Sequence, residues 1–162
     1  MSASPIRLLL QNLDEGYRTA AWHGPNLRGA LRGITAREAA WRPRPGRHSI
    51  WEIAVHAAYW KYAVRRRLTG EKRGSFAISG SNWFPPPDRA TDEAWKADLA
   101  LLEREHRLLR RAVAALAPSR LLERSKGSRQ QNARLVMGIA AHDVYHAGQI
   151  QLLKVLHRER GL

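Results

Sequence analysis

The feature that most constrains the fold is a set of four long segments in which leucine and alanine recur every three or four residues. This spacing places apolar side chains on one face of an α-helix, whereas the period-two alternation of a β-strand is nearly absent. Four amphipathic helices can bury their apolar faces by packing into a four-helix bundle. The sequence therefore predicts an all-α protein, in which residues 1–162 form a single helical-bundle domain with its own core.

Local signals set the expected ends of these helices. Ser49 and Glu52 form a capping box at the start of the second, Gly24-Pro25 breaks the first, and Pro118 stops the third. The expected long helices cover about 5–23, 49–69, 91–117 and 132–157, and two short helical pieces near 26–33 and 35–41 lie between the first two.

The stretch from Gly70 to Ala90, rich in Gly, Ser and Pro, joins the second and third helices. It is too long for a tight turn. We expect it to cross the end of the bundle as a long crossover connection or as a lid. Within it, Trp83 could either cover the mouth of a pocket or fill the core, whereas Trp60 and Trp95 are expected to pack inside the bundle.

The chain has no cysteine, so disulfides, thiolate metal sites and a cysteine nucleophile are excluded. Any metal must be held by nitrogen or oxygen ligands. No segment reaches the roughly 18 uninterrupted apolar residues that a membrane-spanning helix needs. The amino-terminal stretch "IRLLLQNLDEGY" is too short, and charged too early, for a signal peptide. We therefore expect a cytoplasmic protein with no membrane association.

The chain is strongly basic, with 28 Lys and Arg against 14 Asp and Glu and a formal net charge of +14. One interpretation is a surface that binds nucleic acid or another anionic partner. The other is a set of arginines on solvated helix faces, because they are scattered from Arg7 to Arg160 and only residues 65–67 form a run. That run lies at the end of a helix, where cations interact favourably with the helix dipole.

The fourth helix carries His142 and His146 one turn apart on its apolar side. Residues at i and i+4 lie about 40° apart around a helix and about 6 Å apart along it, so both imidazoles can hold one metal ion. His56, on the apolar face of the second helix, could supply a third ligand across the bundle. Three neutral imidazoles suit Zn, Ni, Fe or Co and leave a coordination position open. The alternative is that these are hydrogen-bonded core histidines.

Other polar residues near this seam could also belong to the site. "HDVYH" has the spacing of the H-E-x-x-H protease motif, but Asp143 is shorter than glutamate and no further zinc ligand follows in a protease pattern. Asp143 is expected to hydrogen-bond a metal ligand or another helix, or to face solvent. Glu52 is explained by its capping box, and His106 by hydrogen bonding in the core. Tyr59, Tyr145 or Asp143 could act as a base only by pointing at the metal.

Three stretches, "WHGPNLRGAL", "AAWRPRPGRHSIWEIAVHAAYWK" and "AAHDVYHAGQIQLLK", resemble the DinB-like superfamily, which includes the YfiT-type metal-dependent hydrolases. The likeness covers nearly the whole chain. It rests on the order of one histidine in the second helix and an H-x-x-x-H pair in the last. The resemblance implies a four-helix bundle with two parallel pairs, often dimeric, in which His56, His142 and His146 hold a divalent transition metal such as Ni, Zn or Fe.

The resemblance also suggests a class of reaction. Relatives include thiol-dependent S-transferases and a mycothiol-dependent isomerase, in which the metal would activate a low-molecular-weight thiol. A Lewis-acidic metal with open positions can deprotonate a bound thiol or water, which then attacks an electrophile. We therefore expect a homodimeric, metal-dependent hydrolase or thiol-dependent S-transferase with a small-molecule substrate. Two alternatives are a basic protein associated with nucleic acid, in line with the family's link to DNA damage, and a non-catalytic bundle.

Overall fold

The computed structural model describes residues 4–125 and 127–160, and in these residues the secondary structure is helical, with a single isolated bridge between Arg124 and Gln131. The helices are α1 (Pro5–Tyr17), α2 (Leu27–Ala30), α3 (Ala36–Ala40), α4 (Ile50–Thr69), α5 (Asp92–Ala114), the 3-10 helix η1 (Pro118–Leu122) and α6 (Asn132–Glu159). The predicted all-α bundle is confirmed. The ends of the expected domain, residues 1–3 and 161–162, and residue 126 lie outside the described residues.

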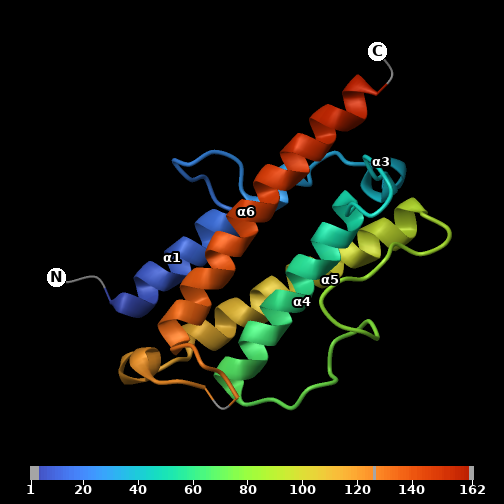
Figure 1. Cartoon of the computed structure of the whole chain (residues 1–162). Coiled ribbons are helices and arrows are strands. Elements are labelled where there is room, and N and C mark those ends of the chain that lie inside the picture. The colour runs from blue at the N-terminus through green and yellow to red at the C-terminus, as the bar shows by residue number, and fades with distance from the viewer. Residues whose placement is uncertain (1–3, 126, 161–162) are drawn as a thin grey trace.

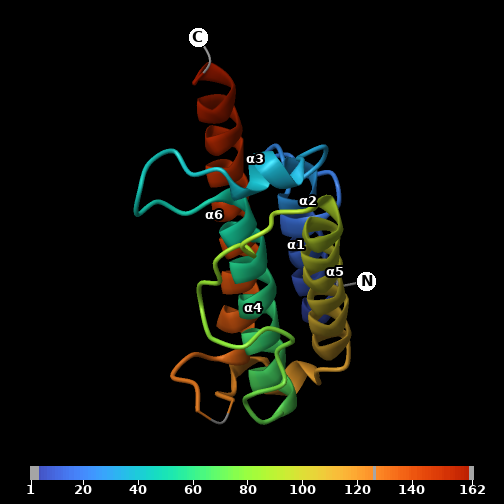
Figure 2. The same cartoon turned by 90° about the vertical axis from the view of Figure 1, so that its right-hand side faces the viewer.

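The four long helices form two parallel pairs. In Figures 1 and 2, α1 and α6 run in one direction, and α4 and α5 run together in the opposite one. The chain must therefore travel back along α4, whose 20 residues span about 30 Å, before α5 can begin. Residues 70–91 make this return beside α4 (Figure 2). The predicted crossover is confirmed, although it passes along the side of the bundle and not across its end.

The ends of α4 follow from its own sequence. The Ser49 hydroxyl accepts from the backbone N–H of Glu52, and the Glu52 carboxylate accepts from the backbone N–H of Ser49, as the capping box predicts. Gly70 ends the helix in the left-handed conformation, with φ of 78°. These two signals set the first and last residues of α4.

The first helix is shorter than expected, and the prediction that it extends to Gly24-Pro25 is wrong. It ends at Tyr17, because the Asp14 carbonyl accepts from the backbone N–H groups of both Arg18 and Thr19, at 2.8 and 2.9 Å. This closes the last turn. The remaining residues before α2 form an irregular connection, in which Trp22 is almost fully exposed.

A polar layer crosses the bundle and separates two hydrophobic clusters. One cluster is built on the first half of α4 and the second half of α6, and the other on the remaining halves together with α1. Between them lie buried polar side chains from three helices: His56 and Lys61 of α4, Glu105 and His106 of α5, and Asp143 and His146 of α6. Burying such groups costs free energy unless each has a partner, so this layer is where the fold departs from simple apolar packing.

Candidate metal centre

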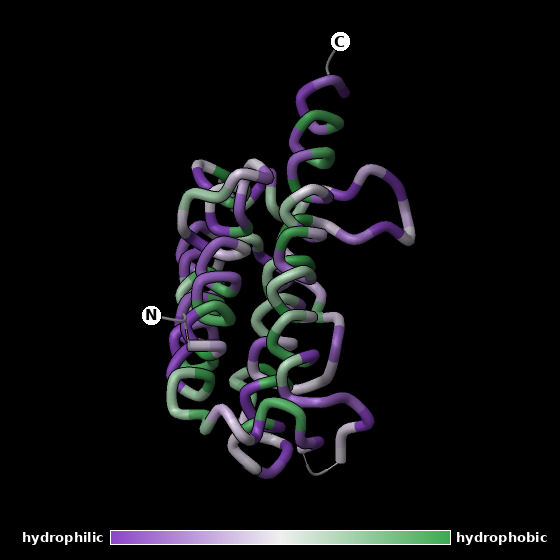
Figure 3. The backbone as a smooth tube through the Cα atoms, turned by 90° about the vertical axis from the view of Figure 1, so that its left-hand side faces the viewer, coloured by the Kyte–Doolittle hydropathy of each residue, from purple (hydrophilic) through white to green (hydrophobic). Residues whose placement is uncertain are grey.

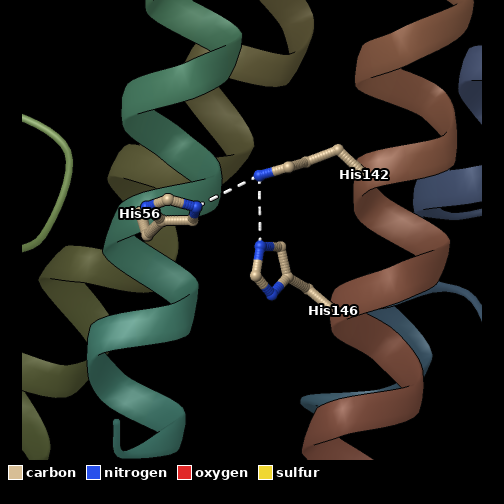
Figure 4. A group of neighbouring side chains, drawn as sticks. All are labelled: His56, His142 and His146. Carbon is tan, nitrogen blue, oxygen red and sulfur yellow. Dashed lines mark hydrogen bonds between the residues drawn. The ribbon is translucent and has the colours of Figure 1, made fainter.

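The histidines predicted from the sequence lie together across the gap between α4 and α6. His56 projects from α4, and His142 and His146 project from α6 toward it (Figure 4). The Nε2 atom of His142 lies 3.1 Å from the Nε2 atoms of both His56 and His146. One nitrogen from each of the three residues lies within 4.8 Å of the others, an arrangement that could hold a metal ion.

The spacing of these nitrogens matches the coordination shell of a first-row metal. With metal–nitrogen bonds of about 2.05 Å, two ligand nitrogens are about 3.3 Å apart at a tetrahedral angle and about 2.9 Å apart at an octahedral one. The two distances of 3.1 Å lie between these values. The cluster is therefore compatible with a metal ion.

Two of the histidines are oriented by hydrogen bonds at their other ring nitrogen. Nδ1 of His56 is 2.7 Å from the backbone carbonyl oxygen of Asn82, and Nδ1 of His146 is 2.7 Å from Oε1 of Gln149. Both partners are acceptors, so each Nδ1 carries the proton and each neutral ring keeps its lone pair on Nε2. This is how proteins fix the tautomer of a metal-binding histidine.

His142 cannot satisfy both neighbours with a hydrogen bond. Its Nε2 faces two lone pairs, but it carries at most one proton, and its buried Nδ1 has no hydrogen-bond partner among the described residues. If His142 is protonated at Nε2, it can donate to only one neighbour and the other lone pair has no donor; if it is protonated at Nδ1, three lone pairs face one another. A cation placed where the three Nε2 atoms converge would accept a lone pair from each of them. The donor set therefore suits a metal better than a hydrogen-bonded core cluster.

The histidines also have the protonation state that metal ligation requires. Burial, together with the neighbouring histidines, lowers the pKa of His142 to about 3. Burial lowers the pKa of His146 to about 4, although the hydrogen bond that His146 donates to Gln149 acts in the opposite direction, and burial lowers the pKa of His56 as well. All three rings are therefore neutral near pH 7, with lone pairs available.

The crossover connection supplies one wall of the centre. Asn82 adopts a left-handed conformation, with φ of 67°, and its side-chain oxygen accepts from Trp60 Nε1 at 2.9 Å. The next residue, Trp83, stacks between His56 and His48, with ring centroids 3.8 and 3.5 Å away. Trp83 therefore covers one side of the cluster, which agrees with the lid interpretation. Trp95 is buried in the core, as expected, whereas Trp60 is half-buried and anchors Asn82.

Asp143 does not face solvent, and it forms an interhelical ion pair with Lys61 of α4. Both side chains are 0% exposed. Burial raises the pKa of Asp143 to about 6, against the opposing charge of Lys61, whose ammonium also lies 4.8 Å from the centre of the Tyr17 ring. Of the three interpretations of Asp143, the contact between helices is confirmed. Lys61 was not anticipated, although a lysine within the apolar stretch of α4 is a detectable signal.

The other candidate residues lie away from the three Nε2 atoms. Glu52 caps α4 and also binds Arg42, at 3.0 Å, and His48, so its capping role is confirmed. His106 stacks on Tyr17, with centroids 3.9 Å apart, and its Nε2 lies 3.4 Å from an Asp14 oxygen. It is a core residue, as expected, but the expected hydrogen bonding is not seen, because neither ring nitrogen has a hydrogen-bond partner among the described residues.

The two tyrosines differ in their relation to the centre. The Tyr59 ring packs against Phe76 and Phe84 in the crossover connection. The Tyr145 hydroxyl accepts from Gln149 Nε2 at 2.9 Å, and its ring lies 5.0 Å from that of His146. Tyr145 is therefore connected to the centre through Gln149, and Tyr59 belongs to the aromatic packing around Trp60. Gln149 was placed on the inward face of the fourth helix, but its bond to His146 was not predicted.

Fold and site together define a class: a helical bundle of two parallel pairs with a buried cluster of three histidines that could hold a metal. The family model described as the DinB superfamily matches residues 19–150, which include all three histidines. The chain therefore belongs to the DinB superfamily. A search of curated proteins and a search of solved structures each found no match. Among the described residues, no helix is both long and apolar enough to cross a membrane.

Proposed function

We propose that this protein binds one divalent transition metal ion, Ni, Zn or Fe, through Nε2 of His56, His142 and His146. With this ion it acts as a hydrolase or as a thiol-dependent S-transferase. The observation that carries the proposal is the convergence of three Nε2 atoms, two of which are lone-pair donors because their Nδ1 protons are held by oxygen acceptors. Imidazole ligands accept each of these metals, so the donor set supports the class of ion and not its identity.

When bound by three imidazoles, such an ion keeps open coordination positions and supplies Lewis acidity that lowers the pKa of a bound water or thiol. The residues of this chain prepare the site for that chemistry. Asn82 and Gln149 hold the imidazoles in the required orientation. The Trp83 ring stacks on His56 and excludes water from that side.

Tyr145 is the side chain best placed to contact a substrate. Its hydroxyl oxygen already accepts from Gln149, so its own proton is free to be donated. The ring is 62% exposed and lines a cavity that also contains His146. We expect Tyr145 to donate a hydrogen bond to a polar group of the substrate. A low-molecular-weight thiol remains the proposed co-substrate of the transferase reaction.

Metal analysis of protein purified without a histidine tag tests metal binding. We expect about one divalent ion per chain, a sharp loss in His142→Ala, and no loss in the control His23→Ala, which changes an exposed histidine. Circular dichroism would show that both variants fold. Full occupancy in folded His142→Ala would refute the proposed ligands.

The reaction class needs a separate assay. Metal-loaded protein would be offered nitrophenyl acetate for hydrolysis, and a chlorodinitrobenzene with a small thiol for transfer, with and without a chelator. Turnover that disappears with the chelator and returns with the metal supports an enzyme. Turnover unchanged by the chelator would refute metal dependence.

A nucleic-acid partner is the second candidate function, and one observation favours it. Arg66, Arg67 and Arg73 line a cavity of about 640 Å³ together with aromatic side chains that include Tyr59 and Trp60. Basic and aromatic groups in one cavity are typical of single-strand binding. A shift assay in low salt, repeated at rising salt, tests this candidate, because such binding weakens steeply with salt. Absence of a shift with both single-stranded and duplex DNA would reject it.

A further inference from the structure

A cavity of about 520 Å³ adjoins the histidine cluster, and His146 and Trp83 both lie in its wall. Other parts of the wall are apolar, with Ile53 from α4 and Leu152 and Leu153 from α6. This volume is within the range of small-molecule sites, which combine apolar walls with a few polar groups. A ligand in the cavity would therefore place its apolar part against α4 and α6, close to the centre.

The charged groups of this cavity are all basic. Arg44 and Arg47 line it, and no aspartate or glutamate does so. In the described part of the chain, no carboxylate lies within ion-pair distance of either arginine. By contrast, Arg18 and Arg110 share the carboxylate of Asp14. The cavity is therefore lined by two guanidinium groups that have no carboxylate partner among the described residues, and such groups suit an oxyanion.

The segment that carries these arginines is held in place before any ligand binds. Pro43 and Pro45 restrict its backbone, since each proline fixes its own φ. Arg42 donates to the backbone carbonyl of Arg47 at 3.0 Å, and its guanidinium also pairs with Glu52 at 3.0 Å. Glu52 lies in the first turn of α4, one turn before His56. The backbone of this segment is thus tied to α4, which carries His56, whereas the side chains of Arg44 and Arg47 are exposed. Less ordering of the backbone is needed on binding.

We propose that this cavity is the substrate site of the centre and that its ligand is a small organic anion, a carboxylate or a phosphate monoester, with an apolar body. The inference rests on the proposed metal-dependent function. The anionic group binds Arg44 and Arg47, and the apolar body lies against Ile53 and Leu152. The rest of the molecule is held beside His146, where Tyr145 is in reach of a polar group.

Calorimetric titration with octanoate, octyl phosphate and octanol tests the proposal, because these probes share an apolar chain and differ in the head group. We expect at least one of the two anions to bind about tenfold or more tightly than octanol. The variant Arg44→Gln with Arg47→Gln should lose about tenfold in affinity for that anion and none for octanol. The preferred head group distinguishes a carboxylate substrate from a phosphate one.

The matched control is Arg37→Gln with Arg129→Gln, which removes the same charge from exposed positions outside this cavity. It should leave anion binding unchanged. Equal affinity for octanol and both anions, or equal loss in the control, would overturn the proposal. Each titration is repeated with metal-loaded and chelated protein. A chain that binds no metal but still binds the anion through Arg44 and Arg47 would refute the metal site while keeping the anion site.

Discussion

The buried ion pair between Lys61 and Asp143 allows the most direct test of the packing beside the centre. Both side chains are 0% exposed, and they join α4 to α6 next to His142. Removing one partner from such a pair leaves an uncompensated charge in the core, which costs about 3–5 kcal/mol of the free energy of unfolding. We therefore expect Lys61→Met and Asp143→Leu each to lower stability by about that amount.

The double variant Lys61→Met with Asp143→Leu should behave differently. The free-energy cost of burying the pair is not fully offset by its contacts, because Oδ1 of Asp143 is buried without a hydrogen-bond partner in the described part of the chain. Replacement of a buried pair by apolar residues of similar volume is typically neutral or stabilising by about 1–4 kcal/mol. We expect the double variant to be at least as stable as the unmodified chain. Since each single variant loses about 3–5 kcal/mol, the coupling energy should then be at least about 6 kcal/mol.

Urea unfolding followed by circular dichroism at pH 7.5, with chelator present throughout, measures all four free energies. The control is the exposed pair of Arg120 and Glu123, where the same cycle should give a coupling of less than about 1 kcal/mol. Additive effects of Lys61→Met and Asp143→Leu would refute the reasoning, as would single variants that each cost less than about 1 kcal/mol.

Three further tests concern other parts of the molecule. Burial, followed by the charge of Lys61, lowers the pKa of His106 to about 3 against 6.5 when unfolded. Its contribution to stability is therefore present above pH 6.5 and is lost as the pH falls toward 3. The stability lost between pH 6.5 and 5 amounts to about 2 kcal/mol. In His106→Gln the measured loss of stability over this interval should be smaller by this amount, and an unchanged loss would contradict the reasoning. Gln149→Leu should weaken metal affinity by about 10- to 100-fold in competition with a chelating dye. The control Gln151→Leu should not, and equal affinities would show that the bond to His146 is unimportant. Hydrophobic residues occur along the length of α6 (Figure 3), and two of them, Met137 and Val155, are 48% and 45% exposed. We expect light scattering to show a dimer, and the double variant Met137→Asp with Val155→Asp to be a monomer. An unmodified chain that is already monomeric would contradict this expectation.

The parts of the fold that were predictable depend on short stretches of sequence. The start of α4 follows from Ser49 and Glu52, which lie three residues apart and bond each other. Likewise, His142 and His146 share a face because of helix geometry alone. The length of the connection after Gly70 indicated a crossover, since parallel neighbours need a long return. In each case the determining contacts lie within one helix or follow from chain length.

The parts that could not be predicted depend on contacts between distant segments. Asn82 orients His56 through its backbone carbonyl, which any residue possesses, so its identity in the sequence carries no signal for this role. Its left-handed conformation becomes visible only once the crossover has packed against α4. The pairing of Lys61 with Asp143 requires the relative register of α4 and α6. The early end of α1 is an exception, because it depends on local bonds from the backbone N–H groups of Arg18 and Thr19 to the carbonyl of Asp14.

The charges in the polar layer connect the proposed metal to the proposed ligand. Around the cluster, the three imidazoles are neutral, and the charge of Lys61 is offset by Asp143, so these groups sum to about zero. The proposed divalent ion, held by them, would therefore carry an uncompensated double charge in a buried site, where electrostatic interactions are stronger than in water. With that ion bound, the centre would favour anions over neutral molecules at its open positions. A centre with carboxylate ligands would lack this preference, because its own charge would offset the metal. Arg44 and Arg47 add positive potential on the side where the cavity opens, so the centre and the cavity select for the same sign of charge.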